Sequence, residues 1–121
     1  MRIARVIGTV TLNQTEPNLR AGSLLVAEAL DARSLAGLER ATPRGTPMPE
    51  SLVVFDELGA GLGQIIAVSE GREASVPFWP QPVPIDAYCA AILDHVVWKQ
   101  VPAARAAEGK SSKAAEQEHR K

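Results

Sequence analysis

The sequence predicts a mainly β domain in which five short strands form a small barrel or sandwich. The apolar runs are short and rich in β-branched residues, which is typical of strands rather than of helices. Glycine and proline lie between these runs and provide the turns that would connect consecutive strands. Several short strands joined by such turns favour an all-β barrel or sandwich.

Length and charge restrict the class of protein further. The chain has 121 residues and a formal net charge of −1, which indicates one small globular domain with a modest core. Proteins that neutralise nucleic-acid phosphates usually carry a clear basic excess, whereas this chain has 13 Lys and Arg against 14 Asp and Glu. Its two Trp, two Phe and one Tyr are too few for a base-stacking platform. We therefore expect no nucleic-acid partner.

The single cysteine and the N-terminus bear on the cellular compartment. Cys89 cannot form a disulfide within the chain and has no histidine at a diagnostic spacing, so we expect it to be a small buried side chain. The first residues lack the apolar segment of a signal peptide, and the longest apolar runs are too short for a membrane span. These features predict a cytoplasmic protein without a membrane partner.

The first predicted strand covers residues 2–12. One face of this strand is predicted to carry Ala4, Val6, Gly8, Val10 and Leu12. The other face is mixed, because Ile3 and Ile7 alternate there with arginine and threonine. A neighbouring subunit that covers this second face would explain the two isoleucines, and scattered surface isoleucines would explain them equally well.

The second strand is predicted at residues 23–30, which are apolar on both faces until Glu28 and so suit a central position. Residues 31–50 contain three prolines and several charges, and they predict a long surface loop. One helical turn is possible within it, because Leu35 and Leu38 have the i, i+3 spacing of neighbours on a helix.

A cluster of three glycines joins the third strand, predicted at residues 51–56, to the fourth, predicted at residues 64–69. Residues 56–64, here called the glycine loop, read Asp-Glu-Leu-Gly-Ala-Gly-Leu-Gly-Gln. A dinucleotide fingerprint requires a third glycine at the position of Gln64 and a following helix, and a phosphate-binding P-loop requires a nearby lysine. The loop therefore favours a structural turn, a bulge or a subunit contact. Asp56 and Glu57 are candidates to cap its amide groups or to bond across that contact.

Residues 74–84 carry four prolines and are predicted to run extended over the surface. Phe78 and Trp79 in this segment either anchor a partner or fold back onto the core, and we favour the second alternative. One helical turn is possible at residues 85–88, followed by a fifth strand at residues 90–98.

The sequence offers few groups for catalysis. Asp94 and His95 would point to opposite faces of a strand, and His119 lies in the polar tail, so neither a catalytic dyad nor a metal site is expected. We predict no enzyme activity, no cofactor and no metal. The tail, residues 102–121, lacks large apolar side chains and is predicted to be a solvated extension of the domain at residues 1–101.

Four sequence blocks in order resemble the EutN/CcmL family, the pentameric vertex proteins of bacterial microcompartment shells. The blocks are Arg5-Val6-Ile7-Gly8-Thr9-Val10, then Pro17, Leu19 and Gly22 before Leu24-Leu25-Val26, then Asp56-x-x-Gly59-Ala60-Gly61-x-Gly63, and Pro84-Ile85-Asp86-Ala87 before Ala91-Ile92-Leu93-Asp94. The third block is the most specific. Three features depart from the family pattern, namely Gln64 in place of the usual Glu, Ser23 in place of a basic residue, and the segment around Phe78 and Trp79.

The resemblance implies an OB-like five-stranded barrel with a short helix, and a homopentamer whose other partners are hexameric and trimeric shell proteins. It also suggests a set of residues at the subunit interface or central pore. This set comprises Ile3, Ile7, Asp56, Gly59, Ala60, Gly61, Gly63 and Gln64. An OB-type module that binds an oligonucleotide or a small ligand is the alternative function.

Overall fold

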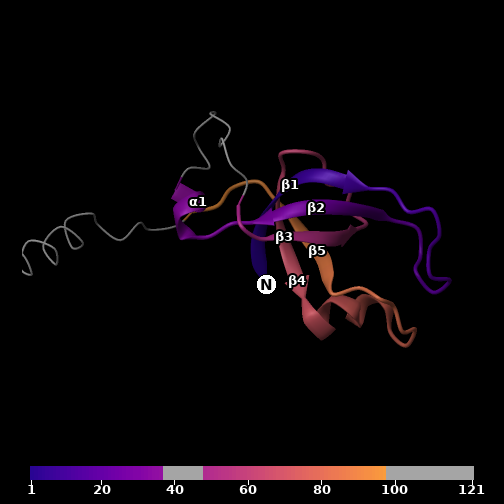
Figure 1. Cartoon of the computed structure of the whole chain (residues 1–121). Coiled ribbons are helices and arrows are strands. Elements are labelled where there is room, and N and C mark those ends of the chain that lie inside the picture. Colours follow the sequence, from indigo (N-terminus) through magenta and orange to yellow (C-terminus); the bar gives the residue numbers. More distant parts are fainter. Residues whose placement is uncertain (37–47, 98–121) are drawn as a thin grey trace, which may run out of the picture.

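The computed structural model describes residues 1–36 and 48–97. Five strands form a closed barrel, with the strand order β1-β2-β3-β5-β4 (Figure 1). The strands are β1 (Arg2–Val10), β2 (Ser23–Ala29), β3 (Ser51–Asp56), β4 (Ile65–Glu70) and β5 (Ala87–Leu93). A helical turn, α1 (Ala32–Ala36), follows β2, and a 3-10 helix, η1 (Gly71–Phe78), follows β4. The predicted mainly β barrel is confirmed.

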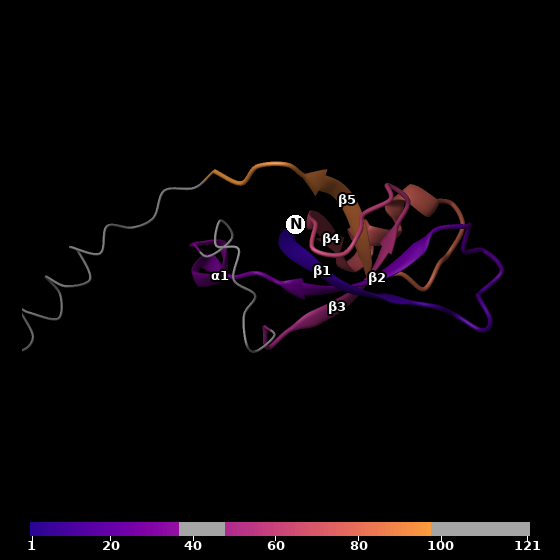
Figure 2. The ribbon, with the colours of Figure 1, turned by 90° about the horizontal axis from the view of Figure 1, so that it is seen from above.

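The barrel has one seam that differs from the others. Adjacent strands pair antiparallel except β3 and β5, which are parallel and share the single register pair Phe55 and Tyr88. Seen from two directions, α1 lies at one end of the molecule and the loop between β1 and β2 at the other (Figures 1 and 2). The segment that carries η1 lies toward the same end as the β1–β2 loop.

Small aliphatic side chains fill the barrel. The core consists of Ala4, Val6, Leu25, Ala27, Val54, Ile66, Val68, Ala87 and Cys89. Five strands enclose a narrow interior, and short or β-branched side chains fill it without voids. Alternation along β3 turns Val54 and Asp56 inward, so that Phe55 between them faces outward.

A β-bulge interrupts β1 and corrects part of the prediction for this strand. Up to Val6, alternate residues face the core as expected, but the register shifts between Val6 and Gly8 and leaves Ile7 as the extra residue. Gly8 then lies opposite Val26, and Val10 opposite Leu24, on the outer face of β2. The predicted inward positions of Gly8 and Val10 are therefore wrong, and the strand ends at Val10 before Leu12.

The remaining strand boundaries agree with the sequence to different degrees. The bounds of β3 are as predicted, and those of β2 and β4 differ by one residue. The helical turn at Leu35 is confirmed, with the Ser34 amide donating to Asp31 Oδ1 at 2.9 Å, whereas Leu38 and the boundary between residues 101 and 102 lie outside the described residues. The expected helical turn at residues 85–88 is wrong, because Ala87 and Tyr88 begin β5 and pair there with the end of β4.

The proline-rich segment is also different from the prediction. Residues 71–78 form η1 instead of running extended, because this turns Ala74 and Phe78 toward the barrel, where both are buried. Pro77 is compatible with so short a helix near its end. Phe78 folds back as favoured from the sequence, whereas Trp79 next to it is 69% exposed.

Candidate subunit interface

The glycine loop begins at a buried carboxylate. Asp56 is the last residue of β3 and is 1% exposed, because the alternation of the strand turns it inward. Its Oδ1 accepts a hydrogen bond from the Leu58 amide at 3.0 Å, and its Oδ2 accepts from the amides of Gly59 at 3.0 Å and Ala60 at 2.8 Å. Three charge-assisted bonds therefore fix the first half of the loop, which is the capping role predicted for Asp56.

The second half of the loop is held by Gln64. Its side-chain Oε1 accepts from the Gly61 amide at 2.6 Å, and its own amide donates to the Gly61 carbonyl at 3.1 Å. Gly59 and Gly63 have φ values of 85° and 83°, which explains glycine at both positions. Gly61 does not share this conformation, and a Cβ built on it would meet only Gln64 Oε1, at 3.7 Å. Neither backbone strain nor crowding within the chain therefore requires glycine at position 61.

The loop lies directly against β1 at the bulge. The Gly63 amide donates to the Val6 carbonyl at 2.8 Å, and the Val6 amide donates to the Gln64 carbonyl at 3.0 Å. The bulge residue Ile7 follows immediately and is 43% exposed. Two further apolar side chains of the loop, Leu58 and Leu62, are also exposed. The structure thus brings Ile7 and the glycines together, next to apolar surface.

Ile3 belongs to a different part of the surface. It lies on β1 opposite Ala67 of β4 and is partly buried. The contact with the glycine loop is made at Val6, three positions farther along β1, where the Val6 amide and carbonyl bond to Gln64 and Gly63. Of the eight residues predicted at an interface, Ile3 is therefore the one that the structure does not bring beside the loop.

Outside the barrel, Glu57 binds two side chains that the sequence did not connect with it. Its carboxylate accepts from Arg20 Nε at 2.7 Å, from Arg20 Nη2 at 2.6 Å and from the Tyr88 hydroxyl at 2.8 Å. The hydrogen bonds from Arg20 lower the pKa of Glu57, and burial together with the bond to Glu57 raises the pKa of Tyr88. No local signal predicts this contact, since Arg20 and Glu57 are 37 positions apart.

Three aromatic rings pack beneath this ion pair, and we call Phe55, Phe78 and Tyr88 the outer aromatic cluster. Phe78 meets Phe55 edge-on with centroids 5.3 Å apart, and Tyr88 is stacked on Phe55 at 6.3 Å. The Arg20 guanidinium lies over the Phe78 ring, 4.1 Å from its centroid. The cluster therefore covers the β3–β5 seam from outside, at the one register pair that joins these strands.

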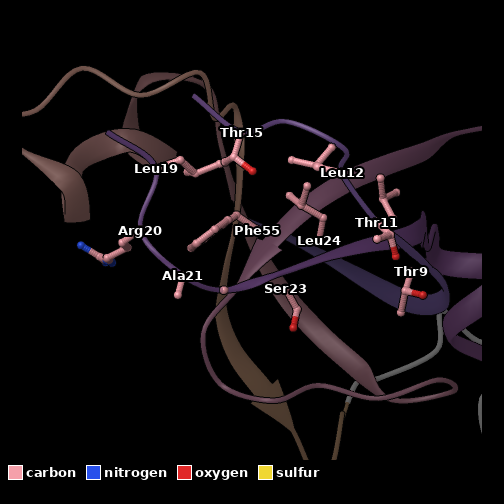
Figure 3. Close-up of a pocket in the computed structure, with 12 residues that line it drawn as sticks. Thr9, Thr11, Leu12, Thr15, Leu19, Arg20, Ala21, Ser23, Leu24 and Phe55 are labelled. Atoms are coloured by element: carbon pink, nitrogen blue, oxygen red, sulfur yellow. The ribbon is translucent and has the colours of Figure 1, made fainter. Parts of the chain in front are cut away.

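An open hollow of about 470 Å³ adjoins the outer aromatic cluster. In Figure 3, Leu12, Thr15 and Leu19 of the loop after β1 lie above Leu24 and Phe55. The lining mixes aliphatic side chains with threonine and serine hydroxyls, and Arg20 is its one titratable side chain.

The remaining candidates from the sequence have structural positions. Cys89 is buried in the barrel as expected, and burial together with the nearby charge of Asp56 raises the pKa of its thiol to about 12. Asp94 and His95 do not lie in a strand as assumed, because β5 ends at Leu93. Their side chains are exposed and 3.5 Å apart instead of on opposite faces. Within the described ranges, no three His, Cys, Asp or Glu residues gather as metal ligands would.

In the part of the chain that the structure describes, no helix has the length and apolar character needed to cross a membrane. A closed five-strand barrel with a short helical turn and a loop held by Asp56 and Gln64 defines a small all-β protein. The chain belongs to the EutN/CcmL family, because the family model described as "Ethanolamine utilisation protein EutN/carboxysome" matches residues 1–94. The family resemblance drawn from the four sequence blocks is confirmed.

Curated relatives support the same assignment. The carboxysome shell vertex protein CcmL of Synechococcus elongatus is 34% identical over 96 residues, which cover 79% of this chain and 86% of the relative. The bacterial microcompartment shell vertex protein EutN of Escherichia coli is 27% identical over 97 residues, which cover 80% and 90%.

Solved structures agree with the barrel. The GrpN pentameric microcompartment shell protein from Rhodospirillum rubrum aligns with a TM-score of 0.63 and 30% identity, covering 82% of this chain and all of that one. The CcmL of Gloeobacter violaceus aligns with a TM-score of 0.62 and 30% identity, covering 81% and 90%. The fold predicted through the resemblance is thereby confirmed.

Proposed function

We propose that this chain is a structural shell protein that forms a homopentamer and occupies the vertices of a bacterial microcompartment. The observation that carries the proposal is the match to shell vertex proteins and to a pentameric shell protein over nearly their whole lengths. A flat layer of hexagonal tiles closes into a shell only if five-fold units occupy its corners, so the function is geometric. A five-fold ring requires a heterologous interface, in which one patch of a subunit contacts a different patch of the next.

The glycine loop is our candidate for the part of the subunit nearest the five-fold axis. Glycine at position 61 is explained neither by its φ nor by crowding within the chain. The close approach of a neighbouring copy would explain it, because a missing side chain lets two backbones come together. We therefore assign Gly59, Ala60, Gly61 and Gly63 to a narrow central opening, with Asp56 and Gln64 holding the loop in shape.

The exposed apolar residues beside the loop support a contact between subunits at the same place. Ile7 lies on the β1 bulge next to Gly63 and Gln64, and Leu58 and Leu62 belong to the loop itself. An interface that covers these side chains would remove apolar surface from water at the point where β1 and the loop meet. Ile3, farther along β1, is proposed to belong to the same contact at its edge.

The partners beyond the ring follow from the vertex role. A pentamer at a corner of a hexagonal layer has five edges that face other tiles, so we propose hexameric and trimeric shell proteins as neighbours. We assign no catalytic function to the chain, and the tail at residues 102–121 is proposed to be dispensable for ring closure.

Native mass spectrometry tests the oligomeric state directly. We expect the full chain and a chain that ends at residue 101 both to give a dominant pentamer. A stable monomer of both at micromolar concentration would contradict the vertex role, and binding of single-stranded DNA at low salt would then be the next measurement.

Substitution of Gly61 by valine tests the axial placement of the loop. We expect Gly61→Val to weaken the ring or to narrow its opening in a cryo-EM reconstruction, because five branched side chains would meet at the axis. Gly61→Ala and Gly8→Ala form a control pair matched in size, since a Cβ at either position would make only ordinary contact within the chain, at 3.7 Å. An intact ring with an unchanged opening in Gly61→Val would place the loop elsewhere.

A further inference from the structure

One arginine outside the barrel joins segments that are distant in sequence. Arg20 belongs to the loop between β1 and β2, and it binds Glu57 through Nε and Nη2 at 2.7 Å and 2.6 Å. Its Nη1 donates to the Pro77 carbonyl in η1 at 3.2 Å, and its guanidinium stacks on the Phe78 ring. Tyr88 of β5 completes the junction through its hydrogen bond to Glu57. Four parts of the chain thus meet at Arg20 and Glu57.

The junction holds the glycine loop near its start. Asp56 anchors the loop from inside the barrel, through the amides of Leu58, Gly59 and Ala60. Glu57 is the next residue, and its carboxylate is fixed on the outside by Arg20 and Tyr88. Asp56 is buried whereas Glu57 is exposed, so these two carboxylates hold the start of the loop from inside and from outside the barrel wall.

The same junction holds the segment that presents Trp79. Phe78 is 5% exposed beneath Arg20, whereas the adjacent Trp79 is 69% exposed. Within the segment, the Trp79 amide donates to the Val76 carbonyl at 3.1 Å. Asn18, two positions before Arg20, donates from Nδ2 to the Pro82 carbonyl at 3.3 Å and ties the far side of the segment to the same loop. The exposed indole is therefore carried by a segment fixed on both sides.

β4 lies between the glycine loop and η1 in the sequence. β4 starts at Ile65, directly after the glycine loop, and ends at Glu70, directly before η1. The end of the glycine loop and the start of η1 therefore lie at opposite ends of β4, whereas the start of the loop is linked to the end of β4 through the pairs Phe55–Tyr88 and Tyr88–Ser69. The seam between β3 and β5, where the junction lies, has only one register pair.

We propose that Arg20 and Glu57 are positioning residues that hold the glycine loop and the Trp79 segment in one fixed relation. The bidentate geometry limits the orientation of both side chains, because the planar guanidinium matches the carboxylate at two points. An exposed ion pair contributes little to global stability, so its effect is expected in local opening. The role of Arg20 and Glu57 within one chain does not depend on the proposed function. Only the link between the glycine loop and the contacts of the pentameric ring rests on it.

Amide hydrogen exchange of the full-length chain tests this inference. In Arg20→Met, which keeps the aliphatic stem but removes the guanidinium, we expect the Gly59 and Ala60 amides and the Trp79 and Gln81 amides to exchange about tenfold faster. The amides of β1 and β4 should be unchanged. Arg72→Met is the matched control, because Arg72 is an exposed arginine of η1 itself. Faster exchange in only one of the two segments, or the same change in Arg72→Met, would overturn the proposal.

Glu57→Gln provides the second arm. If the two residues act as one unit, Glu57→Gln should reproduce the pattern of Arg20→Met, and the double variant should add little to either. If the changes in exchange rate caused by Arg20→Met and Glu57→Gln add in the double variant, the two residues do not act as one unit, and the proposal is wrong. Should Arg20→Met fail to fold, Arg20→Lys decides, because it keeps the charge, loses the two-point geometry and is expected to give the same pattern at a smaller amplitude.

The fluorescence of Trp79, measured in a Trp98→Phe background, tests whether loss of the Arg20 guanidinium loosens the Trp79 segment. We expect Arg20→Met to lower its anisotropy relative to the parent, and an unchanged value would count against the proposal. Since exchange and fluorescence can be measured on a monomer or a ring, a monomeric chain that shows both responses would reject the pentamer and retain the junction.

Discussion

The inside and the outside of the barrel are built from different side chains. The interior contains alanine, valine, leucine, isoleucine and one cysteine, whereas the described aromatic residues, Phe55, Phe78, Trp79 and Tyr88, all lie outside it. Aliphatic side chains already fill the interior of this barrel, and the rings pack over loops and over the seam. The interior therefore determines whether the chain folds, and the outer aromatic cluster determines how its loops are placed.

The largest expected effect belongs to the interior. Leu25→Ala removes a side chain that is 1% exposed, and we expect it to lower the free energy of unfolding by about 3 kcal/mol through lost burial and a residual cavity. Chemical denaturation measures this change. Val97→Ala, at a position 94% exposed and outside the proposed subunit contact, is the control and should change it by less than about 0.5 kcal/mol. If both variants lowered the free energy of unfolding equally, the interior would not dominate the stability of the chain.

The outer aromatic cluster is expected to be sensitive to added volume. A Cβ at Gly22 would lie 2.4 Å from Phe55 Cζ, so Gly22→Ala must displace the Phe55 ring. We expect a loss of about 2 kcal/mol in the free energy of unfolding, accompanied by a changed near-ultraviolet circular dichroism signal. Gly8→Ala adds the same methyl group without a clash and serves as control. If the near-ultraviolet circular dichroism of Gly22→Ala were unchanged, the Phe55 ring would not be displaced, and the prediction would be wrong.

The ion pair over the cluster predicts a smaller, pH-dependent effect. Because Arg20 lowers the pKa of Glu57 in the folded chain, its contribution is fully present above the unfolded pKa of about 4.3 and is lost as the pH falls through the lower folded value. Both side chains are partly exposed, so the contribution of the pair to the free energy of unfolding should be small. The stability difference between the parent and Glu57→Gln should therefore shrink from pH 7 to pH 3. A difference that does not depend on pH would contradict the assignment.

The smallest effect is expected at the exposed indole. Trp79→Ala should change the free energy of unfolding by less than about 0.5 kcal/mol, because 69% of the residue is already exposed to water. Thermal denaturation, with Phe78→Ala as the buried comparison, checks this value. A loss as large as that in Phe78→Ala would mean that Trp79 belongs to the cluster.

The same division explains what the sequence could predict. Alternation of apolar residues locates the strands, because strand formation depends on local periodicity. The inward position of Asp56 has no such signal, since Val53 and Phe55 on the opposite face of β3 are also apolar. The bulge at Ile7 depends on pairing with β2, and β5 begins at Ala87 because the end of β4 requires partners there. Such pairings between distant strands override local turn signals, and local sequence patterns do not predict them.

The candidate site was predictable to the same extent. The glycine block and Asp56 carry local signals, and the mixed face of the first strand pointed to Ile7. The junction of Arg20, Glu57 and Tyr88 joins positions 37 and 31 residues apart, so no window of sequence contains it. The four prolines of residues 74–84 suggested an extended segment, but burial of Ala74 and Phe78 selects a helix for its first part.

The single register pair between β3 and β5 has a consequence for how the chain folds. β4 and β5 pair over six register positions, and Glu70 and Ala87 are 17 positions apart, so these two strands can meet before Phe55 and Tyr88, which are 33 positions apart. The parallel pair Phe55 and Tyr88 closes a longer stretch of chain and offers the fewest main-chain bonds in return. We therefore expect the barrel to close last at this seam, when the rings of Phe55 and Tyr88 stack, so that substitutions there would accelerate unfolding more than they slow folding.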